Sequence, residues 1–308
     1  LPLLHNSTLL IREEERISFL NFTSPSEYEL VGQFDTGVCS DNLQIDGDTL
    51  LIPKEDTYYL ADISDVANPS IYGNVPAYDS YLSPVLTNGL LFLCDGNWEV
   101  RWHVFSLLDP PNIVEISDFK INSYEAFTKS GIILYTMTGS GAVKIDMHNI
   151  GQPDNVQYVG EFAPAPGASC RDPGPVLSVS ERNLFIICNA NTQSILFICD
   201  ISNPASPEKI SETIIPGTYS QILPQGRFLW MLESDFDDMT YWPSPTRNLH
   251  LFDISDPMNP TQIDGLSFGR EVEPAGVLYR DLYFLPGAEG GLHMIRNTEY
   301  HGESIDNW

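Results

Sequence analysis

The chain carries an internal repeat, in which a short apolar run ends in a variation on the phrase Asp-Ile-Ser-Asp-Pro. The phrase is clearest at 200–204 and 253–257, and the copy that starts at Asp62 lacks the proline. A repeat constrains the fold more than any other sequence feature, because each unit must bury its apolar faces against its neighbours. Counting weaker copies, we place seven anchor residues, at Asn21, Asp62, Ser106, Asp146, Asp200, Asp253 and Arg296.

The spacing of the anchors indicates the class of repeat. Neighbouring anchors lie 40 to 54 residues apart, and a unit of about 40–45 residues is typical of a four-stranded propeller blade. Helical repeats of this length are excluded, because the segments show short alternating or wholly apolar runs broken by Pro and Gly. In the second unit, for example, an Asp46-Gly47 turn separates runs at 42–45 and 49–52. The sequence therefore predicts an all-β chain, a seven-bladed β-propeller of four-stranded antiparallel blades.

The prediction fills the chain with a single β-propeller domain over 1–308. We expect the first blade to take its inner strand from 1–4 and the last blade its fourth strand from about 303–308, so that no strand is exchanged between the ends. Because the chain does not begin with Met, we expect it to be a processed chain or a piece of a longer one. The expected blades are roughly 1–35, 36–76, 77–119, 120–162, 163–214, 215–268 and 269–308.

The repeated phrase resembles the LVIVD family of propeller repeats. In that family an apolar strand is followed by Asp, then Ile or Val, Ser, Asp or Asn, and Pro, and the residues from Asp62, Asp200 and Asp253 onward match this pattern best. The resemblance runs along nearly the whole chain. It implies a seven-bladed, WD40-like architecture without Trp-Asp motifs, common in surface or extracellular proteins, and it brings no catalytic motif.

The amino-acid composition limits the classes of partner that the chain can bind. The formal net charge is −27, with 15 Lys and Arg against 42 Asp and Glu, whereas nucleic-acid binding needs a basic stripe. No apolar run approaches the ~18 residues of a membrane-spanning segment. We therefore expect no nucleic acid, no membrane insertion and no cofactor, and the open partners are cations, basic proteins and neutral sugars. The acidity is also explained by solubility alone.

The cysteines and two glycosylation sequons point to different compartments. The five Cys include no Cys-x-x-Cys pair, and Cys94, Cys188 and Cys199 lie in apolar runs where Cys acts as a small hydrophobic residue. This pattern favours a reducing cytoplasm over secretion. Against it stand sequons at Asn6 and Asn21, so the compartment stays open.

Two long steps between anchors, 54 and 53 residues, locate insertions near 162–173 and 233–243. In an up-and-down blade, the connection between the second and third strands and the connection to the next blade emerge on one face. Both insertions therefore fall on one face of blades five and six, and long loops on a rigid scaffold commonly bind ligands. The candidate binding residues at this face and the channel mouth are Asp41, Tyr81, Glu125, Arg171, Asp172, Tyr219, Asp235, Asp238, Tyr241, Trp242 and Glu273.

These observations favour a non-enzymatic interaction module for a protein or a glycan. The alternative is a propeller enzyme (lyase, hydrolase or isomerase) with acids and Tyr at the channel mouth, although no catalytic motif is present; a third is an assembly role for the acidic surface. The acids at 235–238 suggest weak calcium binding, or simply a solvated loop. We expect His103, His250 and His293 to be packing residues with local hydrogen bonds, and His5, His148 and His301 to lie in turns or at the chain end.

Overall fold

The computed structural model describes the greater part of the chain, and all of its regular elements are strands. Side chains of a strand alternate between its two faces, so short strands are what the alternating runs in the sequence predict. The described ranges are 2–12, 15–24, 27–37, 43–78, 84–95, 100–121, 126–138, 143–165, 170, 176–180, 182–190, 193–233, 247–268, 276–279, 282–286 and 292–297.

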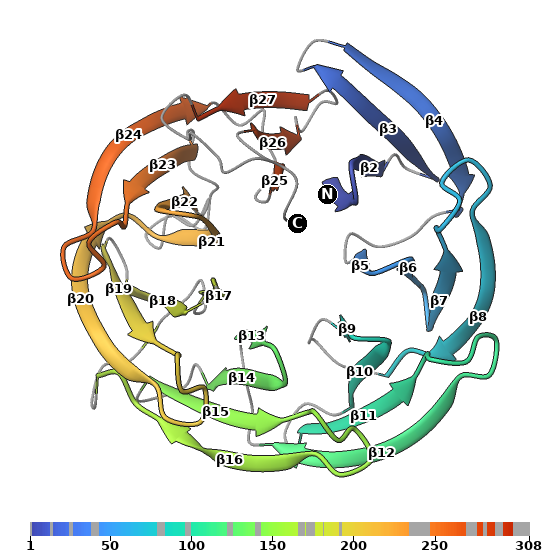
Figure 1. Cartoon of the computed structure of the whole chain (residues 1–308), viewed down its shortest axis with the longest axis horizontal. Helices are drawn as coiled ribbons and strands as arrows, with labels where there is room; N and C mark the ends of the chain where they lie inside the picture. Colours follow the sequence, from blue (N-terminus) through green and yellow to red (C-terminus); the bar gives the residue numbers. More distant parts are fainter. Residues whose placement is uncertain are drawn as a thin grey trace. The chain divides into compact units, whose positions relative to one another are not determined.

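The strands belong to two compact units, which we describe separately. The first unit, residues 1–123 with 153–155, contains three antiparallel four-stranded sheets (Figure 1). We call these blades one, two and three. Blade one is β1 (Pro2–His5), β2 (Thr8–Arg12), β3 (Arg16–Ser24) and β4 (Glu27–Asp35). Blade two is β5 (Gln44–Asp46), β6 (Thr49–Lys54), β7 (Thr57–Asp62) and β8 (Ser70–Pro76). Blade three is β9 (Val85–Thr87), β10 (Leu90–Asp95), β11 (Val100–Ser106) and β12 (Val114–Ile121).

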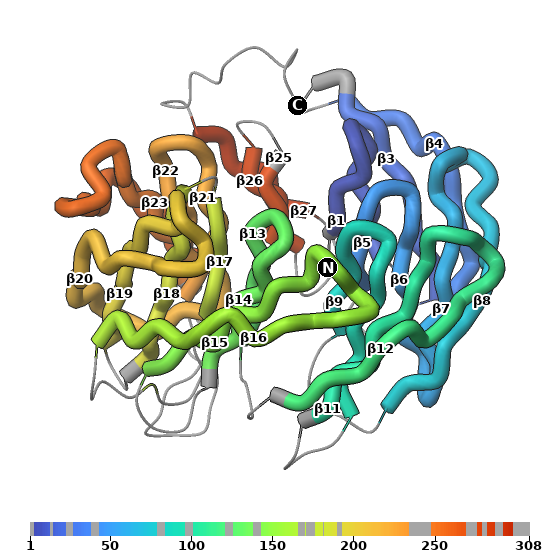
Figure 2. The backbone as a smooth tube through the Cα atoms, turned by 60° about the horizontal axis from the view of Figure 1, so that its bottom comes forward, coloured from blue at the N-terminus to red at the C-terminus, as the bar shows by residue number. Residues whose placement is uncertain are grey.

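The second unit, residues 124–152 with 156–308, contains blades four to seven (Figure 2). Blade four is β13 (Ala126–Ser130), β14 (Ile133–Thr138), β15 (Lys144–Asn149) and β16 (Gln157–Phe162). Blade five is β17 (Val176–Val179), β18 (Asn183–Ala190), β19 (Gln193–Asp200) and β20 (Glu208–Pro216). Blade six is β21 (Tyr219–Gln225), β22 (Phe228–Glu233), β23 (Arg247–Asp253) and β24 (Thr261–Phe268). Blade seven has three described strands, β25 (Val277–Tyr279), β26 (Leu282–Pro286) and β27 (Leu292–Arg296).

This strand order confirms the predicted fold class, a seven-bladed β-propeller. In every sheet the strands pair in chain order, as an up-and-down blade requires. The inner strand of blade one is β1, as expected from the sequence. The fourth strand predicted near 303–308 lies outside the described residues.

The repeated phrase forms the end of the third strand of a blade and the turn that follows it. The Asp62 carboxylate accepts a hydrogen bond from the Ser64 backbone N–H at 2.8 Å, an Asx turn of the kind that Asp favours. Asp200 and Asp253 do the same two residues on, at 2.6 and 2.8 Å. These hydrogen bonds lower the pKa of all three carboxyl groups.

The anchor of blade four is Asn149, not Asp146 as the sequence suggested. Asn149 Oδ1 accepts from the Gly151 N–H at 2.8 Å, and Asn149 pairs with Ile133, the first residue of β14, just as Asp62 pairs with Thr49. Asp146 instead lies buried inside β15, 3.4 Å from the Lys144 ammonium. Because Asn makes the same turn as Asp, the repeat is intact but three residues later.

His148 also departs from prediction. It lies in β15, not in a turn, and is 4% exposed. Burial lowers the pKa of its imidazole, against the opposing effect of the Asp146 charge. The neutral ring is therefore the form that fits this site.

Apolar side chains fill the space between neighbouring blades within each unit. Tyr135 and Met137 of blade four pack against Leu184 and Ile186 of blade five, all fully buried, and burial raises the pKa of Tyr135 to about 12. Fully burying one such side chain contributes about 1.5–3 kcal/mol. Packing is close enough to require glycine at position 32, because a Cβ there would lie 1.9 Å from the Val66 carbonyl oxygen of the next blade.

Amide side chains tie the inner strands of neighbouring blades together. Gln221 Nε2 of blade six donates to the Gly276 carbonyl, and its Oε1 accepts from the Gly276 N–H, both at 2.9 Å. Gln44 of blade two similarly bridges the Pro84 carbonyl and the Leu86 N–H of blade three. In these contacts, which we call amide clamps, a side chain satisfies backbone groups as a paired strand would.

Candidate functional site

Of the eleven predicted binding residues, the structure places Tyr219. The others lie outside the described residues, so the binding role that the sequence predicts for them remains a prediction. They are Asp41, Tyr81, Glu125, Arg171, Asp172, Asp235, Asp238, Tyr241, Trp242 and Glu273.

The two insertions join the strands that the sequence predicted. The first connects β16, which ends at Phe162, to β17, which begins at Val176. The second connects β22, which ends at Glu233, to β23, which begins at Arg247. Because successive strands are antiparallel, both connections emerge at the same end of their blades. The described residues at the bases of these connections form the candidate site.

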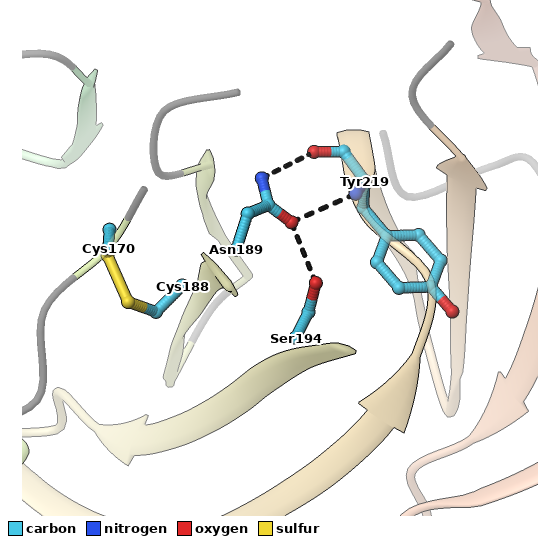
Figure 3. Close-up of a disulfide and its surroundings, with 5 residues drawn as sticks. All are labelled: Cys170, Cys188, Asn189, Ser194 and Tyr219. Carbon is cyan, nitrogen blue, oxygen red and sulfur yellow. Dashed lines mark hydrogen bonds between the residues drawn. A yellow bond between two sulfur atoms is a disulfide. The ribbon is translucent and has the colours of Figure 1, made fainter. Parts of the chain in front are cut away.

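A disulfide ties the middle of the first insertion to blade five. Cys170 lies within that insertion and is bonded to Cys188 of β18, with 4.8 Å between their Cα atoms (Figure 3). The prediction that Cys188 is a small hydrophobic residue without a covalent partner is therefore wrong, although it is buried. Cys94 and Cys199 are buried and form no disulfide, and burial raises the pKa of Cys199 to about 12.

A third amide clamp lies one residue beyond the disulfide. Asn189 is fully buried; its Nδ2 donates to the Tyr219 carbonyl at 3.0 Å, and its Oδ1 accepts from the Tyr219 N–H at 2.9 Å (Figure 3). The Ser194 hydroxyl lies within donating distance of both Asn189 Oδ1 and the Gly217 carbonyl, at 2.8 and 2.7 Å. The hairpin of blade five is therefore fixed to the first residues of blade six.

The structure corrects the expected role of the Tyr219 side chain. The sequence placed it in the loop just before the inner strand of blade six, at the channel mouth, whereas it is the first residue of β21 and is fully buried. Its hydroxyl donates to the Pro216 carbonyl at 2.7 Å. Burial, and to a smaller extent the charge of Glu233, raises the pKa of this phenol. Tyr219 is thus a packing residue at the junction of blades five and six.

Glu233 fixes the base of the second insertion. Its carboxylate accepts a hydrogen bond from Asn248 Nδ2 and lies 3.2 Å from His250 Nε2, so it links the last residue of β22 to β23 after the insertion. Gln262 Nε2 lies 2.9 Å from His250 Nδ1; with the amide in this orientation, His250 carries its proton on Nε2 and donates to Glu233. Gly217 lies against the same carboxylate, because a Cβ there would be 2.5 Å from Glu233 Oε1.

These contacts form one continuous network from the blade five hairpin to the base of the second insertion. Asn189 and Ser194 hold Gly217 and Tyr219 from blade five, and Gly217 touches Glu233 of blade six. The Tyr219 ring also meets the His250 ring edge-on at 5.7 Å between centroids. Its members are Asn189, Ser194, Gly217, Tyr219, Glu233, Asn248 and His250, which we call the blade five–six floor.

Histidines on equivalent third strands show the local bonding that the sequence predicted. His103 Nδ1 lies 2.7 Å from a Glu115 carboxylate oxygen, and its ring stacks on Tyr78 at 4.3 Å. His293 meets Phe268 of the preceding blade edge-on at 5.8 Å. No group of three or more metal-ligating side chains occurs within the described ranges.

Sequence reasoning missed the residues that build the floor. Asn189 and Ser194 flank the hairpin between two apolar strands, and polar residues there read as ordinary turn residues. The usable signal was Asn189 at the end of the apolar run 184–188 of β18, since a buried amide needs hydrogen-bond partners.

Comparison with known proteins shows the fold alone. Hsv2p of Kluyveromyces lactis is 10% identical with a TM-score of 0.60, over 96% of this chain and 95% of that one. Sqt1 of Chaetomium thermophilum is 12% identical with a TM-score of 0.57, over 95% and 79%. The N-terminal domain of Nup159 is 11% identical with a TM-score of 0.55, over 94% and 86%. No family model and no curated protein sequence matches the chain, so LVIVD remains a resemblance.

The structure also bears on the expected absence of a membrane-spanning segment. Across the described ranges, no helix is long and apolar enough to cross a membrane.

Proposed function

We propose that this propeller is a non-enzymatic interaction module that binds a protein or a glycan through the loops over blades five and six and the channel mouth. The observation that carries the proposal is the blade five–six floor, which holds the base of the second insertion in place through Glu233, Asn248 and His250. A preordered base lowers the entropic cost of binding by the loops it carries. The Cys170–Cys188 disulfide supports the same interpretation, because it restrains the insertion at its middle and not only at its ends.

The enzyme alternative receives no support from the described residues. Tyr219, the one described member of its proposed acid–base set, is buried, and its hydroxyl donates to a backbone carbonyl. Glu233 and His250 satisfy each other and their neighbours. A structural floor explains this pairing without any reaction.

The test is partner capture after cross-linking in the native source. The binding variant replaces Arg171, Tyr241 and Trp242 with Ala. The matched control replaces Tyr28 and Tyr158, which are 64% and 56% exposed on outer strands. We expect a reproducible protein or glycan partner with the wild type and the control, and a loss of at least about tenfold, worth about 1.4 kcal/mol, with the binding variant. Equal recovery by all three would overturn the proposed face.

Calcium binding at 235–238 is a separate proposal. Titration of the metal-free protein with Ca²⁺, compared with a variant carrying Asp235→Asn and Asp238→Asn, should show one weak site that the variant lacks. Identical isotherms would assign these acids to solvation alone.

A further inference from the structure

The hairpin turn between β1 and β2 presents an exposed asparagine. Asn6 and Ser7 are both exposed at the tip of this turn. Asn6 adopts a left-handed backbone conformation with φ 53°, which Asn tolerates better than most residues. The equivalent turns of other blades place Gly47, Asn88 and Gly131 in the same conformation, with φ of 54°, 52° and 55°. The turn therefore explains an Asn or Gly at position 6.

The strand position two residues later accommodates a threonine without requiring one. Thr8 begins β2 and is 8% exposed. The equivalent first residues of β6, β10, β14 and β22 are Thr49, Leu90, Ile133 and Phe228, so the fold accepts either a threonine or an apolar side chain there. A hydroxyl at this position is what the Asn-x-Ser/Thr sequon requires. Asn88 occupies the same turn in blade three but is followed by Leu90, so it lacks the sequon.

The disulfide supplies a second, independent observation. Cys170 and Cys188 are bonded and buried, and such bonds persist in oxidising compartments and are rare in the cytosol. N-linked sugars are found on proteins that enter those compartments. The bond and the sequon lie in different units, so neither accounts for the other.

We propose that Asn6 is an N-glycosylation site, occupied in a protein that matures in an oxidising compartment. The Asn6 Nδ2 attacks the anomeric carbon of a lipid-diphosphate-linked oligosaccharide, held by an oligosaccharyltransferase. The new bond joins Nδ2 to that carbon, the bond from the carbon to the diphosphate oxygen breaks, and Nδ2 loses one proton as the lipid diphosphate leaves. The amide keeps one N–H, so its 3.1 Å contact with His5 Nε2 survives the modification.

The second sequon, at Asn21, provides a contrast within the same blade. Asn21 lies inside β3, paired with Thr8 on one side and Glu29 on the other. Once the sheet forms, the extended backbone around it is enclosed by two strands. Asn6, in contrast, remains at an exposed turn, so we expect modification at Asn6 and none at Asn21.

The experiment is site mapping on protein purified from its native source. Treatment with peptide-N-glycosidase in H₂¹⁸O converts a glycosylated Asn into ¹⁸O-labelled Asp, which peptide mass spectrometry locates. We expect the label at Asn6 and not at Asn21 or Asn88. An unlabelled Asn6 overturns the proposal, and so does equal labelling of Asn21.

Two variants made in the native host test the turn without disrupting it. Asn6→Gly keeps a residue suited to positive φ, and Thr8→Val keeps the shape of a buried side chain. Each should lower the mass of the intact protein to the unmodified value, whereas Thr23→Val, which removes the other sequon, should leave it unchanged. A glycan that persists in both Asn6→Gly and Thr8→Val would contradict the assignment.

Discussion

Blades three and six carry a histidine at the same position of the third strand, but its neighbours differ. His103 pairs with Leu93 and His250 with Met231, the fourth residue of the second strand in each blade. The sixth residue of that strand is Asp95 in blade three and Glu233 in blade six. The longer Glu233 reaches His250 Nε2 at 3.2 Å, whereas Asp95 stops 3.8 Å from His103 Nε2. The one methylene group by which Glu is longer than Asp therefore decides whether the carboxylate reaches the histidine.

The other side of each ring differs in charge. Glu115 faces His103 Nδ1 in blade three, and Gln262 faces His250 Nδ1 in blade six. In blade six the carboxylate beside the ring, that of Glu233, lies at the insertion base, while in blade three two half-exposed acids lie around a ring that also stacks on Tyr78. Because Glu233 also binds Asn248, we infer that the blade six cluster holds a loop in place and the blade three cluster mainly packs.

Removing the two acids should give the largest contrast. Glu233→Ala leaves His250 and Asn248 without their shared acceptor in a mostly buried site, so we expect a loss of about 2–3 kcal/mol in the free energy of unfolding. Asp95→Ala should cost less than about 1 kcal/mol, because its carboxylate is half exposed and makes no close contact with His103. Urea denaturation measures both. Equal losses would remove the distinction between the two clusters.

Exchanging the acid lengths should reverse the contrast. Glu233→Asp opens the contact with His250 and should cost about 1–1.5 kcal/mol, the worth of a typical hydrogen bond. Asp95→Glu should bring a carboxylate within reach of His103 Nε2 and stabilise blade three by about 0.5 kcal/mol. The sign of the Asp95→Glu change in thermal midpoint is the decisive readout, since destabilisation would show that side-chain length is not what separates the two blades.

A double-mutant cycle should isolate the stacking in blade three. With Tyr78→Leu, His103→Leu and the double variant, we expect a coupling energy of about 0.5–1 kcal/mol, as for other ring pairs. Burial, with the nearby charges of Glu115 and Asp95, raises the pKa of Tyr78, so the cycle is run near neutral pH. A coupling energy of zero would show that the two rings lie side by side without stabilising each other.

The smallest expected difference between blades three and six is in how stability depends on acidic pH. The anchor of blade six is Asp253, whose pKa is lowered by hydrogen bonds from the Ser255 hydroxyl and N–H; the anchor of blade three is Ser106, which does not titrate. A lowered folded-state pKa gives stability that is present above the ordinary value of about 3.9 and lost as the pH falls through the folded-state value.

The variant Asp253→Asn should therefore lose stability less steeply below about pH 4 than the wild type. Thermal melts from pH 5 to pH 2.5 measure the slope, with Ser106→Ala as the control that leaves it unchanged. An identical slope in Asp253→Asn and the wild type would contradict the assignment.

The sequence was most informative where a side chain bonds to the backbone only a few residues away. The Asx turns at Asp62, Asp200 and Asp253 are local, so the repeated phrase located the strands and predicted seven blades. The same reasoning gave the wrong anchor in blade four. It chose Asp146, whereas Asn149, three residues later, forms the turn.

Contacts between segments distant in the chain could not be predicted from the sequence. Nothing in the spacing of five cysteines pairs Cys170 with Cys188, because connectivity is not readable from sequence. Asn189 finds Tyr219, 30 residues away, only once two blades are packed. Sequence reasoning placed Tyr219 in the loop before its strand and missed its buried side chain, since an aromatic at a strand start is compatible with either face.

The amide clamps have a consequence for how the blades diversify. Asn189, Gln44 and Gln221 bind backbone N–H and C=O groups of the next blade, and Gln221 Oε1 also accepts from the Tyr283 hydroxyl. The receiving strand is therefore free to change its residues, provided that it stays extended and keeps its N–H, whereas the donating amide is not free. Substitutions should therefore accumulate in the strand that receives the clamp and not at the amide that forms it. Neighbouring blades can then diverge in sequence while three amide side chains keep their strands aligned.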